Sequence, residues 1–527
     1  MLIEYFGKLA AGLAAGLLCV ACATTEDPAR GYSKAVIGAL ETAGENRAEL
    51  EKVLNHYAAA GDSLKLRAAM HLIANMEGHS YVTYKFVDTA GTEVIFNALD
   101  YADYPAVQAA SDSIEETHGE LDYKRKETIE DLDVITADFL IEQINYAFKA
   151  WRERPWAKGL SFDDFTACVL PYRGSNEPLE PWRKTFWDKY ADITTHMADS
   201  TDPVEAAALI NDDIKSWFTF DPHYYYHPTD QGMTEMLAAG KGRCEDMTNV
   251  TIYAMRANGL AVTSDYTPHW ANTGNNHAWN AIVTPDGRVI PFMGAEANPG
   301  AYGLVNKAAK VYRKTFAKQP QNLCFQDNQQ EKTPGWLAGK SYVDVSPDYL
   351  DVCDITVTFE RDIPDSVNIA YLCVFNSGEW RAVHWGRITD NMAAFTDMGT
   401  GVAYLPALYM NEEIVPFGRP FVVDSNCTVE EFQQNRDSPA PVRVTQTTQG
   451  LWSYSTESIA MIPLSPKQEY ELCYWDDGWH SIATAVAGDG PLVFDDVPTN
   501  GLYWLTALGS DREERIFSIE DGIQVWW

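Results

Sequence analysis

The sequence predicts a multidomain α+β protein whose architecture changes twice along its 527 residues. Apolar residues recur at helical spacing through 30–200, and a helix followed by alternating strands occupies 201–340. Short alternating strands with Gly, Pro and Asn turns fill the rest of the chain. We therefore expect a helical N-terminal region, an α+β core, and two C-terminal β-sandwich-like modules at 341–445 and 446–527. The hydrophobic content of 46% is ample for several cores.

Residues 1–22 predict a signal peptide. The apolar run from Leu9 to Ala21 is too short to span a membrane and suits a secretory signal. It ends at Cys22, ahead of a polar and acidic stretch, and resembles a bacterial lipoprotein signal with Cys22 as the lipidated residue. The acidic residues resemble the export signal of surface lipoproteins in Bacteroides-like bacteria. We expect a cell-envelope lipoprotein, periplasm-facing or surface-exposed on the outer membrane, with plain secretion as the alternative.

The expected helical region precedes and packs on the core. Its first part, from Ser33 to Leu72, has apolar residues at helical spacing and is interrupted at Gly61. Further helices are predicted at 106–117, 132–151, 182–198 and 203–218.

The core carries the most informative motif of the chain. Residues 242–246, Gly-Arg-Cys-Glu-Asp, open an apolar helical pattern, and 276–280, Asn-His-Ala-Trp-Asn, lie in an alternating strand pattern. A Cys at a helix start followed by a His on a strand is typical of a nucleophilic thiolate–imidazole pair. The helix N-terminus is expected to lower the pKa of the thiol, and the imidazole takes its proton. These positions predict Cys244 and His277 as catalytic residues.

These motifs resemble the transglutaminase-like superfamily, whose core reads G-x-C-x-D, then a helix ending in R-x-x-G, then H-x-W on a strand. The matching residues here are Gly242, Cys244, Asp246, Arg256, Gly259, His277 and Trp279. The resemblance covers roughly residues 200–300 and implies a papain-like α+β core with a Cys–His–Asp triad. Members of the superfamily include cross-linking acyltransferases, peptidases, glycan amidases and inactive proteins, so the fold does not select the reaction.

The third triad residue departs from this pattern. The family Asp aligns near Met293 or Gly294, and neither side chain can orient an imidazole. Glu296 is the nearest carboxylate on that strand. If 286–287, Asp-Gly, form a two-residue hairpin turn, Glu296 lies opposite His277, and we predict it as the orienting acid. A one-residue slip would turn it to the other face.

Other residues of the motif receive supporting roles. Trp279 shares a strand face with His277, so it is predicted to wall the substrate cleft, with core packing as the alternative. Asn276 is predicted to contact the substrate. Asp246 is expected to accept backbone N–H groups in the first helical turn.

No cofactor or metal is predicted. His223 and His227 have a metal-like spacing, but the tyrosines between them and Pro228 disfavour a helix, and no Cys lies nearby. The body of the chain holds an odd number of cysteines spread over three hundred residues, which predicts no disulfide framework.

The net charge of −35 argues against nucleic acid and anionic lipid as partners. Contact with a membrane is expected only through the N-terminal lipid. The expected substrate is a peptide, glycopeptide or glycan.

The C-terminal part contains an internal repeat. Residues 369–380 parallel 470–479, and each stretch leads about twenty residues on to an aromatic strand, at 402–409 and 501–508. A spacing near one hundred residues predicts two similar β-sandwich-like modules. The aromatic strands could stack on sugars, although hydrophobic core is the preferred interpretation for most of their tryptophans. These are Trp380, Trp385, Trp475, Trp479 and Trp504.

Two functions remain open at this point. The first is an exported cysteine enzyme that hydrolyses or transfers an amide bond through a thioester, with the backbone N–H of Cys244 holding the oxyanion. Hydrolysis is favoured over transfer because water is abundant outside the cell. The alternative is a weakened or inactive relative that binds glycan or peptide through its cleft and β-modules.

Overall fold

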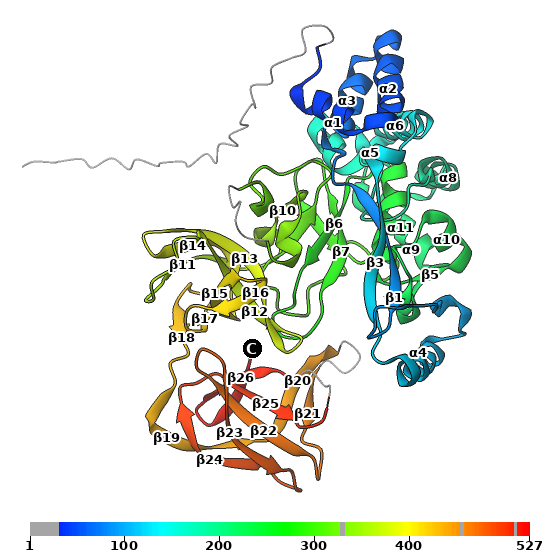
Figure 1. Cartoon of the computed structure of the whole chain (residues 1–527). Coiled ribbons are helices and arrows are strands. Elements are labelled where there is room, and N and C mark those ends of the chain that lie inside the picture. Colours follow the sequence, from blue (N-terminus) through cyan, green and yellow to red (C-terminus); the bar gives the residue numbers. More distant parts are fainter. Residues whose placement is uncertain (1–30, 327–332, 454–457, 511–513) are drawn as a thin grey trace, which may run out of the picture.

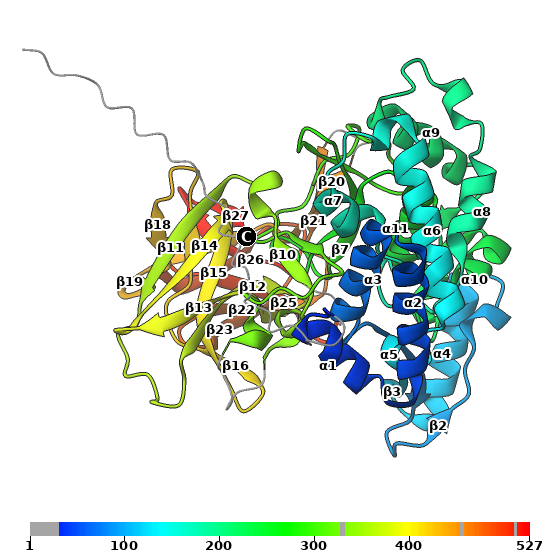
Figure 2. The ribbon, with the colours of Figure 1, turned by 90° about the horizontal axis from the view of Figure 1, so that it is seen from above.

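The computed structural model describes residues 31–326, 333–453, 458–510 and 514–527. The predicted signal peptide lies outside these residues. Helices gather on one side of the molecule and strand-rich parts on the other (Figures 1 and 2). This agrees with the predicted mixture of helix and sheet, with a β-rich C-terminal region.

Four helices form the N-terminal layer, and their apolar faces join the main hydrophobic core. They are α1 (Lys34–Thr42), α2 (Arg47–Ala60), α3 (Ser63–Asn75) and α6 (Ala137–Glu153). Local signals set their limits: Ser33 and Asp62 accept backbone N–H groups at the starts of α1 and α3. Gly61, with a positive φ, ends α2.

A three-stranded sheet interrupts this helical region, which the sequence did not predict. Its order is β2-β1-β3, and α4 (Tyr104–His118) lies between the second and third strands in the chain. The strands are β1 (Ser80–Val87), β2 (Glu93–Val94) and β3 (Asp122–Glu130). Because β3 is exposed along most of its length, it has no apolar alternation for a sequence pattern to reveal.

The core places a buried helix against a five-stranded sheet of order β10-β9-β6-β7-β8. The helix is α11 (Cys244–Ala257), which is buried from Asp246 to its last residue. Helices α8 (Trp182–Lys189), α9 (Pro203–Lys215) and α10 (Met233–Ala239) contact α11. The strands are β6 (Val262–Thr267), β7 (His277–Val283), β8 (Val289–Phe292), β9 (Tyr312–Lys314) and β10 (Tyr342–Asp344).

The β7–β8 hairpin has a different turn from the one predicted. Thr284 and Arg288 flank a three-residue loop, since Thr284 N donates to Arg288 O and Gly287 N donates to Thr284 O. Gly287 has φ +83°, which favours glycine and closes this loop. The observed register pairs Asn280 with Phe292, one residue away from the register that a two-residue turn would give.

The first β-module, defined here as residues 352–431, forms one curved sheet (Figure 1). Its path is β11-β14-β13-β12-β15-β17-β18, with β16 paired to β15. The strands are β11 (Val352–Thr358), β12 (Ile369–Asn376), β13 (Glu379–Thr389), β14 (Met392–Gly399), β15 (Val402–Met410), β16 (Glu413–Pro416), β17 (Phe421–Val423) and β18 (Val429–Glu431).

A disulfide joins Cys353 of β11 to Cys427, just before β18. The sequence predicted no disulfide framework, and this single bridge corrects that expectation. The odd cysteine count concealed it, because five cysteines of the described chain stay free: Cys168, Cys244, Cys324, Cys373 and Cys473.

The second β-module, defined as residues 435–526, contains a five-stranded sheet of order β23-β22-β25-β26-β27 and two strand pairs, β19-β24 and β20-β21. The strands are β19 (Asn435–Val444), β20 (Gln446–Ser453), β21 (Ser458–Pro463), β22 (Glu469–Trp475), β23 (Trp479–Val486), β24 (Leu492–Thr499), β25 (Tyr503–Ala507), β26 (Ile516–Glu520) and β27 (Ile523–Trp526). Because β19 pairs with β24, it belongs to the second module, and the boundary between the modules lies before β19 rather than at residue 445.

The internal repeat is visible in the strand pairing. β12 lies between β13 and β15, and β22 lies between β23 and β25. Both central strands shift register at equivalent positions, between Leu372 and Cys373 and between Leu472 and Cys473. The two modules therefore share a three-stranded unit with the same irregularity.

Both modules are joined to the core by buried hydrogen bonds. The Asn376 side-chain amide donates to the carbonyls of Trp270, Thr273 and Asn275, each at 2.9 Å. The Arg515 guanidinium donates to the carbonyls of Phe375 and Ala271. These two side chains therefore tie backbone carbonyls of the core loop at 270–275 to the β-modules.

Candidate active site

The start of α11 is tightly organised. Cys244 is its first residue, and Asp246 accepts hydrogen bonds from Arg243 N at 2.9 Å and Gln231 N at 3.1 Å. The expected role of Asp246 as a backbone acceptor is confirmed. An ion pair between Arg243 and the buried Asp230 adds to this frame, and burial raises the pKa of Asp230 to about 6.

The Cys244 thiol is half-buried and un-ionised at neutral pH. Burial, followed by the neighbouring Glu245 charge, raises the pKa of Cys244 to about 11. A hydrogen bond with the Tyr225 hydroxyl and the Arg243 charge act in the opposite direction. The predicted lowering of the thiol pKa by the helix N-terminus is therefore wrong, because desolvation and a like charge outweigh the helix dipole.

A charged group that the sequence did not single out lies next to the thiol. Glu245 accepts a hydrogen bond from Lys314 Nζ at 2.6 Å, and the same nitrogen lies 2.7 Å from Ser175 Oγ. These contacts hold the pKa of Glu245 below its usual value despite burial. The charge of Glu245 adds to the effect of burial in raising the pKa of Cys244. At His277 it acts against burial, which lowers the pKa of the imidazole, so this carboxylate acts on both candidate catalytic residues.

His277 begins β7 and lies among aromatic rings. Its ring centroid is 5.9 Å from that of Trp270, 5.9 Å from that of Trp279 and 6.4 Å from that of Tyr302. Burial lowers the pKa of His277 to about 4. The imidazole is therefore neutral at physiological pH.

The predicted thiol–imidazole hydrogen bond is not formed among the residues that the structure describes. On β7 the Asn280 side chain faces α11, because its amide donates to Thr248 O at 3.4 Å. Side chains alternate along a strand, so Trp279 points to the other face. His277 is the first residue of β7, and the charge of Glu245, next to Cys244, reaches its ring. The structure brings Cys244 and His277 to neighbouring elements without joining them directly.

The two predicted substrate-binding residues differ in accessibility. Trp279 is 0% exposed and lies in the hydrophobic core, so its predicted role in walling the cleft is wrong. Asn276 is exposed beside His277 and remains available for the predicted contact.

Glu296 does not lie opposite His277. β8 ends at Phe292, and a tight turn follows in which Met293 and Ala297 exchange backbone hydrogen bonds at 3.0 and 2.9 Å. Glu296 lies exposed in this turn, and partial desolvation alone raises its pKa. Its prediction as the orienting acid fails because the hairpin register differs by one residue.

The structure accounts for the glycine at 294, one of the two positions near which the family acid aligns. A Cβ at this residue would lie 2.3 Å from Thr251 Oγ1 and 2.8 Å from Met247 O of α11. The close approach of α11 excludes any larger residue at this point.

A buried carboxylate does lie behind Trp279. Asp265 of β6 lies opposite Trp279 on the neighbouring strand β7. Its two carboxylate oxygens accept hydrogen bonds from the Arg313 guanidinium at 2.8 and 2.7 Å. Tyr349 also donates to it. These hydrogen bonds occupy both oxygens of the Asp265 carboxylate. Its partners lie far away in the sequence, so no local pattern indicates the network.

A cavity of about 360 Å³ opens beside the Glu245–Lys314 pair. Ser175, Lys314 and Ser264 contribute to its wall, together with the buried Arg256. Among the described residues, no group of three or more His, Cys, Asp or Glu side chains is arranged to hold a metal ion. No helix of the described ranges is long and apolar enough to cross a membrane.

Comparison with known proteins supports the core assignment. A sequence profile described as the Transglutaminase-like superfamily matches residues 191–293, so this segment forms a transglutaminase-like domain. Among solved structures, the chain is similar to red sea bream transglutaminase at 9% identity with a TM-score of 0.18. That match covers 85% of this chain and 76% of the other. No curated protein sequence matches the chain.

Proposed function

We propose that this protein is an exported transglutaminase-like cysteine enzyme that acts on an amide bond of a peptide or glycopeptide. The observation that supports this most is the position of Cys244: a half-buried thiol begins the central helix of the transglutaminase-like segment. Buried charged groups surround it on several sides, at a cost in stability that a purely structural cysteine does not require.

In the proposed reaction, His277 takes the thiol proton and Cys244 Sγ attacks the amide carbonyl. The helix-start N–H groups, including that of Cys244, stabilise the oxyanion. The C–N bond breaks as the proton passes to the leaving amine, which leaves a thioester on Cys244. Water then attacks the thioester, releases the acid and restores the thiol.

The pKa values set a requirement on this reaction. The values of about 11 for Cys244 and about 4 for His277 make proton transfer from sulfur to nitrogen uphill by roughly 10 kcal/mol. One turnover per second corresponds to a total barrier of about 17 kcal/mol. The resting arrangement therefore permits only slow chemistry, and substrate binding must bring the imidazole to the thiol for efficient turnover.

The pKa values of Cys244 and His277 favour a second candidate function. The thiol and the imidazole are neutral, and among the residues that the structure describes no carboxylate is bonded to His277; such a site suits binding without reaction. In this candidate the protein is an inactive relative that holds a peptide or glycan in the cleft.

Labelling with an electrophilic peptidyl fluoromethyl ketone separates the two candidates. Cys244→Ala is compared with Cys324→Ala, because Cys324 is the other half-buried free thiol of the described chain. The enzyme proposal expects an adduct on Cys244 in wild type and in Cys324→Ala, and loss of that adduct in Cys244→Ala. Wild-type protein that stays unmodified at Cys244 would contradict the enzyme proposal and favour the inactive binding protein.

Export and lipidation of the N-terminus are part of the proposal. We infer that cleavage before Cys22 leaves a lipidated cysteine that anchors the protein in the cell envelope, facing the periplasm or the exterior. Mass spectrometry of the N-terminal peptide from membrane-extracted protein tests this. An unmodified N-terminus on soluble protein would contradict it.

A further inference from the structure

An aromatic groove of about 760 Å³ lies where the core meets the two β-modules. The core contributes His269 and Trp336, the first β-module Trp380 and Tyr409, and the second β-module Trp475 and Trp479. We call this set the seam groove. It is separate from Cys244 and from the cavity beside Glu245, and the reaction proposed above does not use it.

Two buried donors in the seam groove have no partner. Trp380 and Trp475 are 8% and 6% exposed, and within the described parts of the chain neither indole N–H makes a hydrogen bond. Leaving a buried donor unpaired lowers the stability of the folded chain. Both indole rings line the groove, and their N–H groups lie buried beneath its surface.

The groove also offers an open aromatic surface. Trp336 is 42% exposed and packs against Tyr266 of the core, with ring centroids 5.2 Å apart and the two planes tilted by 35°. Trp479 also lines the groove, and its ring centroid lies 5.0 Å from that of Trp475. Flat indole faces beside indole N–H donors suit a ligand with both apolar C–H faces and hydroxyl groups.

The charged groups of the groove narrow the class of ligand. Glu379 and Glu413 line it together with Arg381, which pairs with Glu379 at 3.0 Å. Burial lowers the pKa of His269 to about 4, so that ring is neutral. Acidic groups in excess repel an anionic ligand, whereas paired carboxylates and guanidinium groups exchange hydrogen bonds with sugar hydroxyls.

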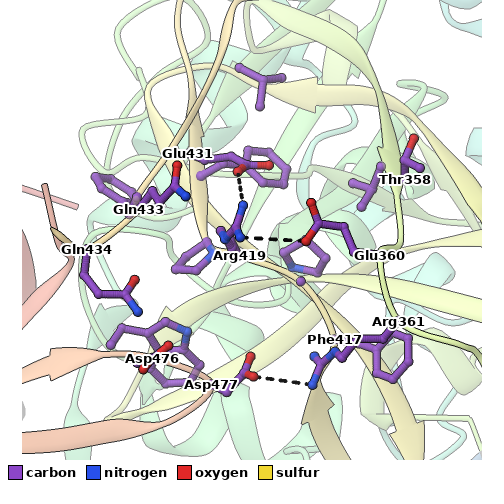
Figure 3. A pocket seen from close by; sticks show the side chains of 18 of the residues that line it. Thr358, Glu360, Arg361, Phe417, Arg419, Glu431, Gln433, Gln434, Asp476 and Asp477 are labelled. Atoms are coloured by element: carbon purple, nitrogen blue, oxygen red, sulfur yellow. Dashed lines mark hydrogen bonds and ion pairs between the residues drawn. The ribbon is translucent and has the colours of Figure 1, made fainter. Parts of the chain in front are cut away.

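A second cavity of about 600 Å³ lies beside the groove at the seam between the modules, and Trp475 lines both. In this cavity Arg361 of the first module pairs with Asp477 of the second at 3.5 Å. Figure 3 shows Arg419 between the carboxylates of Glu360 and Glu431. The side-chain amides of Gln433 and Gln434 line the same cavity. A polar extension of an aromatic groove fits a chain of sugars.

The groove adjoins the turn that holds the loop before His277. The turn between β12 and β13 lines the groove with Gly378 and Glu379. Next to this turn, the Asn376 amide holds the carbonyls of Trp270, Thr273 and Asn275, and Ser377 Oγ lies 3.3 Å from Asn275 N. A ligand in the groove therefore lies against the element that fixes the loop before His277.

We propose that the seam groove binds a neutral oligosaccharide. Resting on the proposed function, this makes the substrate a glycopeptide whose sugar chain occupies the groove while its peptide reaches Cys244. The indole rings stack on sugar faces, and the carboxylates accept hydrogen bonds from sugar hydroxyls.

The test uses the full chain and an array of neutral oligosaccharides, followed by titration of the strongest binder. Trp336→Ala and Trp479→Phe are compared with Phe325→Ala, because Phe325 is also 42% exposed, in a neighbouring segment outside the groove. We expect a dissociation constant below about 1 mM in wild type and in Phe325→Ala. Trp336→Ala is expected to weaken binding at least tenfold, and Trp479→Phe at least threefold.

Two results would overturn the proposal: no neutral oligosaccharide on the array binds, or binding is unchanged in both Trp variants. Binding of tetralysine alone would assign the groove to cationic peptides instead. Cys244→Ala keeps oligosaccharide binding if the groove acts independently of the thiol. Wild-type protein that binds oligosaccharide but is not labelled at Cys244 would count against the enzyme proposal alone. Wild-type protein that is labelled at Cys244 but binds no oligosaccharide would count against the groove alone.

Discussion

Lys314 Nζ lies 2.6 Å from Glu245 Oε1, beside the Cys244 thiol. This ion pair keeps a negative charge next to the candidate nucleophile, and that charge raises the pKa of Cys244 and of His277. The carboxylate therefore has opposite effects on the two partners of a proton transfer. It disfavours the thiolate and favours the imidazolium.

Replacement of Glu245 tests this balance. In Glu245→Gln the neighbouring anion is lost while Lys314 keeps its charge, so the pKa of Cys244 should fall. We expect alkylation of Cys244 by iodoacetamide at pH 8 to become roughly threefold to tenfold faster. The rate is followed by mass spectrometry of the Cys244 peptide. Glu296→Gln, which removes a carboxylate from the turn after β8, is the matched control and should leave the rate unchanged.

The pH dependence of alkylation reports the state of the thiol directly. Since the pKa of Cys244 is about 11, the thiolate fraction grows about tenfold per pH unit between pH 7 and 10, and the rate should follow it. A pre-formed thiolate–imidazolium pair would instead give a rate that hardly changes across this range. A flat profile would show that the free protein already holds the ionised pair.

Glu296 should have little influence on activity. A triad acid orients the imidazole, and its loss costs several orders of magnitude, but Glu296 lies exposed in the turn after β8. We expect Glu296→Ala to change amide cleavage by less than about threefold. Steady-state kinetics on any cleaved peptide amide checks this. A hundredfold loss with unchanged thermal stability would restore Glu296 to the site.

Two half-buried histidines should make the protein less stable in mild acid. In the folded chain the pKa values of His277 and His269 are about 4, below the usual value of about 6.5 for an unfolded chain. Between these values the unfolded chain binds more protons, so stability is highest above pH 6.5 and falls as the pH drops toward 4. By pH 5 each residue accounts for roughly 2 kcal/mol of this loss.

Denaturant unfolding at pH 7 and pH 5 measures the effect. His277→Gln and His269→Gln should each reduce the difference in unfolding free energy between the two pH values. His56→Gln, which changes an exposed histidine, should not reduce it. Equal pH dependence in all variants would place the acid sensitivity elsewhere.

The disulfide should stabilise the first β-module. It closes a loop with a sequence separation of 74, for which the chain-entropy treatment gives about 4 kcal/mol. We expect the Cys353→Ser, Cys427→Ser double variant to melt earlier in the transition of that module, and reduction of wild type to have the same effect. Cys324→Ser serves as the control for removal of a free thiol. An unchanged transition in both cases would exclude a stabilising bridge.

Sequence reasoning succeeded where the pattern is local. The start of α11 at Cys244 and the β7 strand at His277 follow from a short motif with regular apolar spacing. The repeat was visible because Leu372-Cys373 and Leu472-Cys473 lie in strands with matching aromatic neighbours. Such features depend on residues within a few positions of one another.

The remaining features depend on distant partners or on a single turn residue. Glu245 and Lys314 are 69 positions apart, and nothing near either residue indicates their pairing. One extra residue in the loop at Pro285 changed the register and removed Glu296 from His277. β3 is exposed along most of its length, so it lacks the alternation by which strands are recognised.

The Asn376 amide has a consequence for the order in which the protein matures. The three carbonyls that it satisfies belong to Trp270, Thr273 and Asn275, about one hundred residues earlier in the chain. While the chain is being made or exported, this donor is missing until β12 has emerged and folded, and only the Asn275 carbonyl has a local partner, the N–H of Trp270. The loop before His277 therefore reaches its final form late, and a core released without its first β-module would carry an unfinished site.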